Sequence, residues 1–176
     1  MYLSRVAQVI LLVFYNHFVT DREEPFDQPG TPEEPKGHYI FDKPEPLWNF
    51  GHGKSYTTFD YVDCALSDTL LAASDTLKVS VMIKNTGRCD GKEVVQLYVR
   101  DKVSTVATPI QQLKAFQKVL VKSGESQCVE LSLPIAELAL YNAKMEEVVE
   151  PGDFEIQIGA ASDDIRFKKT ITINRK

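Results

Sequence analysis

Hydrophobic and polar residues alternate with a period of two through much of the chain after residue 60. In the stretch 76–84 the odd positions are Leu, Val, Val and Ile, and the even positions are mostly polar. Successive side chains of a strand point to opposite faces, so this pattern is typical of a half-buried β-strand. Residues 95–101 repeat it. Further strands are expected near 113–120, 128–133, 153–158 and 167–173.

Turn-forming residues separate these segments. Asn85–Gly91 contains two glycines, which tolerate positive φ, and Lys122–Glu125 and Glu150–Asp153 are also turn sequences. Pro134–Leu138 places a proline at a plausible first helical position, which predicts one short turn of helix. About seven short strands joined by frequent turns predict an all-β fold, an antiparallel β-sandwich of the immunoglobulin-like class.

The N-terminal segment has two interpretations. The apolar run Val6–Tyr15 follows Arg5 and imitates a signal peptide, but Gln8 interrupts it and no small-x-small cleavage site follows. The run is too short to span a bilayer. The alternative is a buried strand that ends at Tyr15-Asn16-His17 and belongs to a preceding domain. We favour the strand for residues 1–20.

Proline dominates the next segment. Six of the nine prolines lie between Pro25 and Pro46, among acidic residues that include Glu23, Glu24, Glu33 and Glu34. Proline fixes φ and removes a hydrogen-bond donor, so neither a helix nor a central strand passes through. We therefore expect an extended linker.

Composition narrows the classes of function. A hydrophobic fraction of 43% and a charged fraction of 26% are ordinary for a globular chain. A net charge of −5 without a charged block argues against nucleic acid as a partner, and we expect no membrane partner. Cys64, Cys89 and Cys128 match no zinc-ligand spacing, so we predict neither a metal site nor a cofactor.

The run Trp48–Phe59 reads W-N-F-G-H-G-K-S-Y-T-T-F. It resembles the hinge motif of family-3 glycoside hydrolases, P-L-x-P-F-G-x-G-L-S-Y-T-x-F, which joins the catalytic domains to a C-terminal fibronectin-III-like domain. Further segments that resemble this family are Val81–Gly87 (V-x-V-x-N-T-G), Asp90–Val99 (G-x-E-V-V-Q-L-Y-V), Pro109–Phe116 (P-x-x-x-L-K-G-F), Lys122–Ser126 (K-P-G-E-S/T), and Glu150–Phe154 with Ile158-Gly159 (E-P-G-x-F/Y-x-x-x-I-G). Two residues depart from these motifs, Ala115 in place of glycine and Ser123 in place of proline, and both are expected in turns. Near the start of the chain, Asp21 stands where glycine is usual in the family.

The resemblance implies a division into three parts. Residues 1–20 would be a remnant strand of the preceding α/β domain, 21–59 the proline-rich linker and hinge, and 60–176 a fibronectin-III-like sandwich. It also implies that the parent enzymes are retaining β-glycosidases. Their nucleophilic aspartate lies in an N-terminal (β/α)₈ barrel and their acid/base typically in the domain after it, both upstream of this region. We therefore predict no catalytic, cofactor-binding or metal-binding residue in this chain.

The carboxylates present offer no substitute pair. Retaining hydrolysis needs two carboxyl groups about 5 to 5.5 Å apart. Adjacent residues of a strand point to opposite faces, and in loops such pairs are most simply solvated. No histidine lies in a nucleophile-elbow or H-E-x-x-H context. The residues considered are Glu23/Glu24, Glu33/Glu34, Glu146/Glu147, Asp163/Asp164, His17, His38 and His52.

Two hinge residues allow alternative readings. His52 lies between Gly51 and Gly53, so it could contact a preceding domain or line a sugar cleft, but a packing role at a hinge is favoured. Trp48 could stack on a sugar ring, but we favour a role for it in an interdomain core.

Three functions follow. The favoured one is a structural, accessory part of a retaining β-glycosidase whose partners are the catalytic domains. The alternatives are a stand-alone carbohydrate-binding sandwich and a subunit that completes a separately encoded catalytic half. Carbohydrate binding would require a row of exposed aromatics, and Tyr98, Phe116, Tyr141 and Phe154 are scattered through the chain. Sugar specificity and localisation stay open.

Overall fold

The computed structural model describes residues 48–174. The expected remnant strand of residues 1–20, with Tyr15-Asn16-His17, lies outside the described residues. So does the proline-rich part of the linker, with its glutamate pairs and with His17 and His38. The division at residues 20 and 59 therefore stays a prediction.

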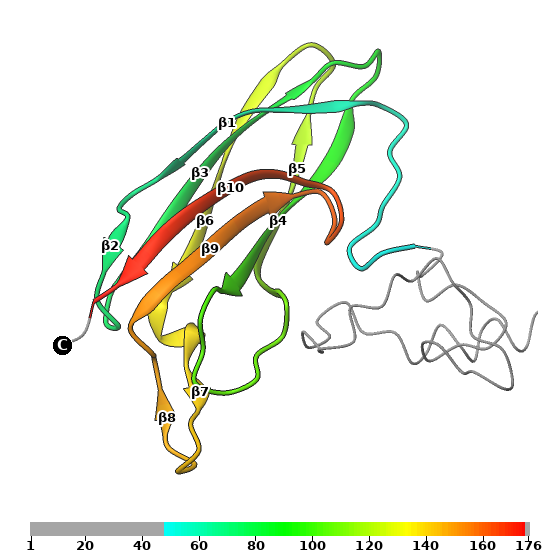
Figure 1. Cartoon of the computed structure of the whole chain (residues 1–176). Coiled ribbons are helices and arrows are strands. Elements are labelled where there is room, and N and C mark those ends of the chain that lie inside the picture. The colour runs from blue at the N-terminus through cyan, green and yellow to red at the C-terminus, as the bar shows by residue number, and fades with distance from the viewer. Residues whose placement is uncertain (1–47, 175–176) are drawn as a thin grey trace, which may run out of the picture.

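The described part of the chain is built almost entirely from strands (Figure 1). One short 3₁₀-helix, η1, spans Ile135–Leu138. The strands are β1 (Phe59–Leu66), β2 (Leu70–Leu71), β3 (Thr76–Asn85), β4 (Gly91–Asp101), β5 (Gln112–Val121), β6 (Ser126–Pro134), β7 (Leu140–Tyr141), β8 (Glu147–Val148), β9 (Gly152–Gly159) and β10 (Ile165–Ile173).

Two sheets form a sandwich (Figure 1). The three-stranded sheet has the order β1-β3-β6, and the five-stranded sheet has the order β2-β10-β9-β4-β5. All pairs are antiparallel except β2 with β10, which is parallel. The small β7-β8 hairpin projects beyond one end of the sandwich. The predicted immunoglobulin-like β-sandwich is thus confirmed.

The core lies between the two sheets and follows the alternation of the sequence. In β3, Leu77, Val79, Val81 and Ile83 are fully buried, whereas the residues between them are half-buried or exposed. Burial of each such side chain stabilises the fold by about 1.5–3 kcal/mol. The inner faces of β4 and β9 supply the opposite half of the core.

Strand β4 departs from this alternation. Five consecutive residues, from Val95 to Val99, are buried, so the middle of the strand is covered on both faces. Val95, Leu97 and Val99 face the core. Gln96 and Tyr98 therefore face outward, yet their exposed fractions are 3% and 0%. Another segment of the chain therefore covers the outer face of the five-stranded sheet at Gln96 and Tyr98.

The predicted strands are confirmed, each longer than the pattern indicated. The placement of Ala115 in a turn was wrong, because this residue lies within β5 and pairs with Leu97. Strand β1 and the two-residue strands β2, β7 and β8 were not predicted. The predicted helical turn is present as η1, with Pro134 directly before its first residue. The role given to Gly87 and Gly91 was wrong, because positive φ among the described glycines occurs at Gly51, Gly124 and Gly152.

Candidate functional site

The hinge segment, residues 48–58, packs against the sandwich. It begins with a tight turn in which the His52 amide donates to the Asn49 carbonyl at 3.0 Å. Gly51 occupies the third position of this turn with φ of 81°, a conformation that glycine adopts without steric cost. A Cβ at this position would overlap Gln96 Oε1 and lie 2.9 Å from the Tyr98 hydroxyl. The turn thus lies directly on the outer face of β4.

Gln96 ties the hinge to the five-stranded sheet. Its Nε2 donates to the Gly51 carbonyl at 3.1 Å and also to the Ala160 carbonyl. Its Oε1 accepts from the Tyr98 hydroxyl at 2.6 Å. A buried amide is costly unless it is hydrogen-bonded, and here both ends of the amide have partners. The covered outer face of β4 is therefore a satisfied contact.

The β9–β10 turn holds the hinge from the other side. The Ser162 amide donates to the Phe50 carbonyl at 2.9 Å, and Asn49 Nδ2 donates to Asp163 Oδ2 at 2.6 Å. Gln111, just before β5, donates through Nε2 to the Ser162 carbonyl at 2.9 Å. Three segments far apart in sequence therefore meet at this turn.

Asn85 organises the end of the sandwich where the hinge becomes β1. This residue is fully buried at the end of β3. Its Nδ2 donates to the carbonyls of Cys89 at 2.8 Å and Val121 at 2.9 Å. Its Oδ1 accepts from the Thr57 hydroxyl at 2.6 Å and from the Gly87 amide at 3.0 Å. Asn85 thereby joins both sheets and the hinge.

The two glycines of the Asn85–Gly91 turn make room for Thr57. A Cβ on Gly87 would overlap Thr57 Oγ1, and a Cβ on Gly91 would overlap Thr57 Cγ2. Beyond Thr57, the Thr86 amide donates to the Thr58 carbonyl at 2.9 Å. Glycine is needed at these two positions because the hinge passes close to the backbone there. The reason is not the positive φ that the sequence suggested.

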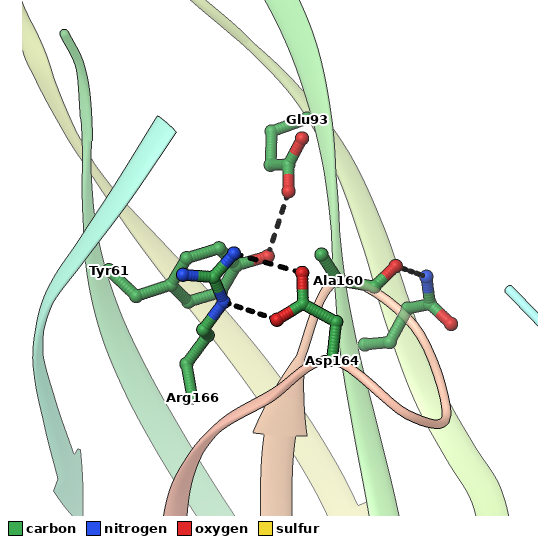
Figure 2. Close-up of polar contacts among 6 residues, drawn as sticks. Tyr61, Glu93, Ala160, Asp164 and Arg166 are labelled. Atoms are coloured by element: carbon green, nitrogen blue, oxygen red, sulfur yellow. Dashed lines mark hydrogen bonds and ion pairs between the residues drawn. The ribbon is translucent and has the colours of Figure 1, made fainter. Parts of the chain in front are cut away.

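A polar cluster that includes Asp164 of the β9–β10 turn bridges the two sheets (Figure 2). The Tyr61 hydroxyl of β1 donates to Glu93 Oε1 of β4 at 3.0 Å. Arg166 of β10 lies over the Tyr61 ring, 5.7 Å from its centroid. Arg166 also holds Asp164 through two contacts, of Nε at 2.6 Å and of an Nη at 2.9 Å. The cluster therefore connects β1 to the turn that holds the hinge.

Burial sets the protonation of this cluster. It raises the pKa of Tyr61 well above its ordinary value, and the neighbouring Glu93 carboxylate raises it further. Burial also raises the pKa of Glu93, against the opposing effects of the Tyr61 hydroxyl and the Arg166 charge. The hydrogen bond to Asp164 raises the pKa of the Arg166 guanidinium. Tyr61 is therefore neutral and Arg166 charged at neutral pH.

The outward side of the hinge is aromatic. Trp48 is 63% exposed, Phe50 is 43% exposed and Tyr56 is fully exposed. The His52 side chain is exposed as well, and only its backbone amide takes part in the hydrogen bond of the turn. The interpretation of Trp48 and His52 as interdomain contacts stays a prediction, because the structure describes only residues 48–174.

The carboxylate pairs within the described residues have separate partners. Asp163 accepts from Asn49 and Asp164 binds Arg166, so the expectation that they are merely solvated was wrong. Glu146 accepts from Asn142 Nδ2 at 2.9 Å, within the β7-β8 hairpin, and Glu147 is exposed. Within residues 48–174 no group of three or more His, Cys, Asp or Glu side chains could hold a metal ion.

Sequence reasoning missed the side chains that hold the hinge. Gln96 belongs to a recognised motif, but the sequence does not show that this outward-facing side chain is buried. Asp163 follows the Ile158-Gly159 motif and was not considered as a hinge contact. A glutamine and a tyrosine at successive outward positions of a strand are a weak signal of a covered face.

Membrane-spanning helices were also sought. In the part of the chain from Trp48 to Asn174, no helix is long and apolar enough to cross a bilayer.

A family model described as a fibronectin type III-like domain matches residues 93–162. The chain is 43% identical over 143 residues to a β-xylosidase of Formosa agariphila, a match that covers 80% of this chain and 19% of the relative. It is 42% identical over 131 residues to thermostable β-glucosidase B of Acetivibrio thermocellus, covering 74% of this chain and 17% of that protein.

Solved structures give the same picture. A β-glucosidase of Listeria innocua in complex with glucose is similar with a TM-score of 0.75 and 33% identity, over 93% of this chain and 22% of that one. A β-glucosidase involved in saponin metabolism from intestinal bacteria is similar with a TM-score of 0.78 and 31% identity, over 94% of this chain and 21% of that one. The chain thus spans about a fifth of the length of these proteins.

Proposed function

Because the chain belongs to the family-3 glycoside hydrolases through their hinge and fibronectin-III-like domain, we propose that it is an accessory part of a β-glucosidase- or β-xylosidase-type enzyme. In this role the sandwich packs on catalytic domains through the hinge and steadies their position. The reaction, hydrolysis of O-glycosyl bonds, belongs to those domains. They are either part of the same polypeptide or a separately encoded partner.

The observation that carries this proposal is the asymmetry of the hinge. Its inner side is fixed to the sandwich by Gln96, Asp163 and the Ser162 amide. Its outer side presents Trp48, Phe50 and Tyr56 to solvent. A segment that is held rigidly on one side and exposes large aromatic side chains on the other is suited to contact a second body.

We further propose that residues 48–174 do not hydrolyse glycosides by themselves. A retaining mechanism needs a nucleophile and an acid/base in facing positions. Asp163 and Asp164 each have a separate structural partner, and Glu93 is engaged by Tyr61. These interactions support a role for the carboxylates in holding the fold.

The test is an assay of aryl β-glucoside and aryl β-xyloside hydrolysis. We expect no turnover by the chain alone. We expect turnover when residues 48–174 replace the matching region of A. thermocellus β-glucosidase B. Hydrolysis by the chain alone would contradict the accessory role, and so would an inactive chimera whose parent enzyme is active.

Carbohydrate binding by the sandwich is less well supported. Tyr98 and Phe154 are buried, and the exposed Phe116 and Tyr141 lie on β5 and β7, so the four do not form one platform. Isothermal titration with cellobiose and xylobiose separates the two functions. Millimolar or tighter binding by the isolated chain would favour the carbohydrate-binding alternative.

A further inference from the structure

The outer face of β5 carries two large apolar side chains that the fold does not use. Phe116 is 66% exposed and Leu120 is 55% exposed. Phe116 belongs to the segment Pro109–Phe116 that resembles a family motif, but its side chain adds little to the core. Two large apolar side chains exposed on one face of a strand form a patch, and contiguous exposed apolar patches mark contact surfaces.

These side chains lie beside the hinge. Phe116 pairs with Gln96, and Leu120 pairs with Lys92 on the same side of β4. Directly opposed residues of paired strands share a face, about 4.5–5.5 Å apart at Cβ. Gln96 is the residue that bonds the Gly51 carbonyl, so Phe116 stands next to the hinge turn. Hinge and β5 therefore border the same outer face.

We propose that the hinge aromatics and these two β5 residues form one docking surface, the apolar strip, for the catalytic part of a family-3 glycosidase. The apolar strip consists of Trp48, Phe50, Tyr56, Phe116 and Leu120. This inference rests on the proposed function and extends it from the hinge to the sandwich itself. The occupant covers both the hinge and the outer face of β5.

The position of the chain supports this occupant. The 47 residues before Trp48 are joined to the sandwich at one end of the apolar strip. Any domain on that side is held close to the strip by the covalent connection, which gives it a high effective concentration there. A second copy of this chain or an unrelated partner has no such advantage.

Charge defines the chemistry of the partner. Lys92 and Lys118 are exposed and alternate with the apolar positions of β4 and β5, and Lys122 follows β5. Lys118 lies between Phe116 and Leu120 on this face, so apolar and basic side chains are interleaved, and the surface fits a partner whose contact combines apolar and acidic side chains. The overall charge of −5 makes this local basic group distinctive.

The test uses the chimera of residues 48–174 with A. thermocellus β-glucosidase B. Phe116→Lys and Leu120→Lys place a charge in the apolar strip, and Met145→Lys is the matched control. Met145 is 78% exposed at the tip of the β7-β8 hairpin, which projects from one end of the sandwich (Figure 1). The readouts are the half-life of aryl β-glucosidase activity at elevated temperature and the melting temperature of each isolated chain.

We expect Phe116→Lys and Leu120→Lys to shorten the half-life of the chimera about tenfold or more, as loss of a central interface residue does. The control should keep the half-life within about twofold, and the isolated chains should melt at nearly the same temperature, since all three sites are exposed. Half-lives of the β5 variants equal to that of Met145→Lys would overturn the inference while the accessory role stands.

Two further outcomes also count against it. Concentration-dependent dimerisation of the isolated chain that Phe116→Lys abolishes would assign the strip to a second copy. A chimera that is inactive with the unmodified sequence contradicts the accessory role itself, and the inference falls with it.

Discussion

The two sheets of the sandwich treat their outer faces differently. On the three-stranded sheet, the outward residues of β3 are exposed or half-buried, and the alternation of the sequence is kept. On the five-stranded sheet, Gln96 and Tyr98 of β4 face outward and are buried beneath the hinge. One sheet thus only closes the core, while the other also carries the segment that leads to the rest of the protein.

This difference shows where a sandwich can accept an additional layer. An outward strand position that becomes buried must satisfy its polar groups, because an unpaired buried donor or acceptor costs about 1–3 kcal/mol. Gln96 and Tyr98 do so through each other, Gly51 and Ala160. The outward residues of β3 stay accessible to solvent, so their polar groups do not need partners within the protein.

The largest expected effect comes from breaking the point where both sheets and the hinge meet. Asn85→Ala removes four hydrogen bonds and takes the Asn85 donor from the carbonyls of Cys89 and Val121. We expect a loss of about 3 kcal/mol in the free energy of unfolding. Urea denaturation measures it, with the exposed Lys84→Ala as control, and equal stability of the two variants would contradict the role of Asn85.

Gly51→Ala tests the hinge turn alone. The new Cβ overlaps Gln96 Oε1 and needs a positive φ, so we expect the turn to lift from β4 at a cost of about 2 kcal/mol. Trp48 is the single tryptophan of the chain, and its fluorescence reports the change directly. Gly53→Ala is the matched control, since no atom lies within 4 Å of a Cβ there. Identical spectra for both variants would count against the docked turn.

Gln96→Leu sharpens the comparison of the outer faces. Leucine fills the same space but leaves the carbonyls of Gly51 and Ala160 without this donor, so we expect a loss of about 1.5 kcal/mol. The equivalent change on the other sheet, Met82→Leu, should cost less than about 0.5 kcal/mol. Thermal unfolding compares the two, and a larger cost for Met82→Leu would refute the distinction between the faces.

The smallest effect concerns Glu93 and depends on pH. Burial raises its pKa in the folded state above the ordinary value of 4.5, so the folded chain binds this proton more tightly than the unfolded chain. The contribution of Glu93 to stability is therefore fully present below pH 4.5 and is lost as the pH rises through the raised pKa. Glu93→Gln keeps an acceptor for Tyr61 and does not titrate.

The measurement is the stability of wild type and Glu93→Gln in urea from pH 4 to pH 8. We expect the variant to gain relative to wild type as the pH rises, until Glu93 is fully ionised. Glu125→Gln, at an exposed position, is the control for the change from carboxylate to amide. A pH-independent difference between wild type and Glu93→Gln would contradict the pKa shift of Glu93.

The sandwich could be predicted because its core strands keep a period of two that only a half-buried strand explains. β3 is the clearest case, since its four inner residues are all buried. Strands β2, β7 and β8 have two residues each, too few to show any period. β1 was missed because a bulge between Tyr61 and Asp63 interrupts its alternation.

The candidate site could be predicted only in part. The hinge was recognised from its sequence, but its contact partners lie in β4 and in the β9–β10 turn, more than 40 residues away. Local patterns carry no information about such pairings. Gly87 and Gly91 illustrate this limit. Glycine is required at both positions because Thr57 lies where a Cβ would be, and only folding brings Thr57 close to them.

The path of the hinge has a mechanical consequence. The chain passes from the outer face of the five-stranded sheet to β1, the first strand of the other sheet. Tension applied before Trp48 would load the contacts of Asn49 and Gly51 first, and only afterwards the β1–β3 ladder. The hinge contacts would therefore yield before the strands of the sandwich separate.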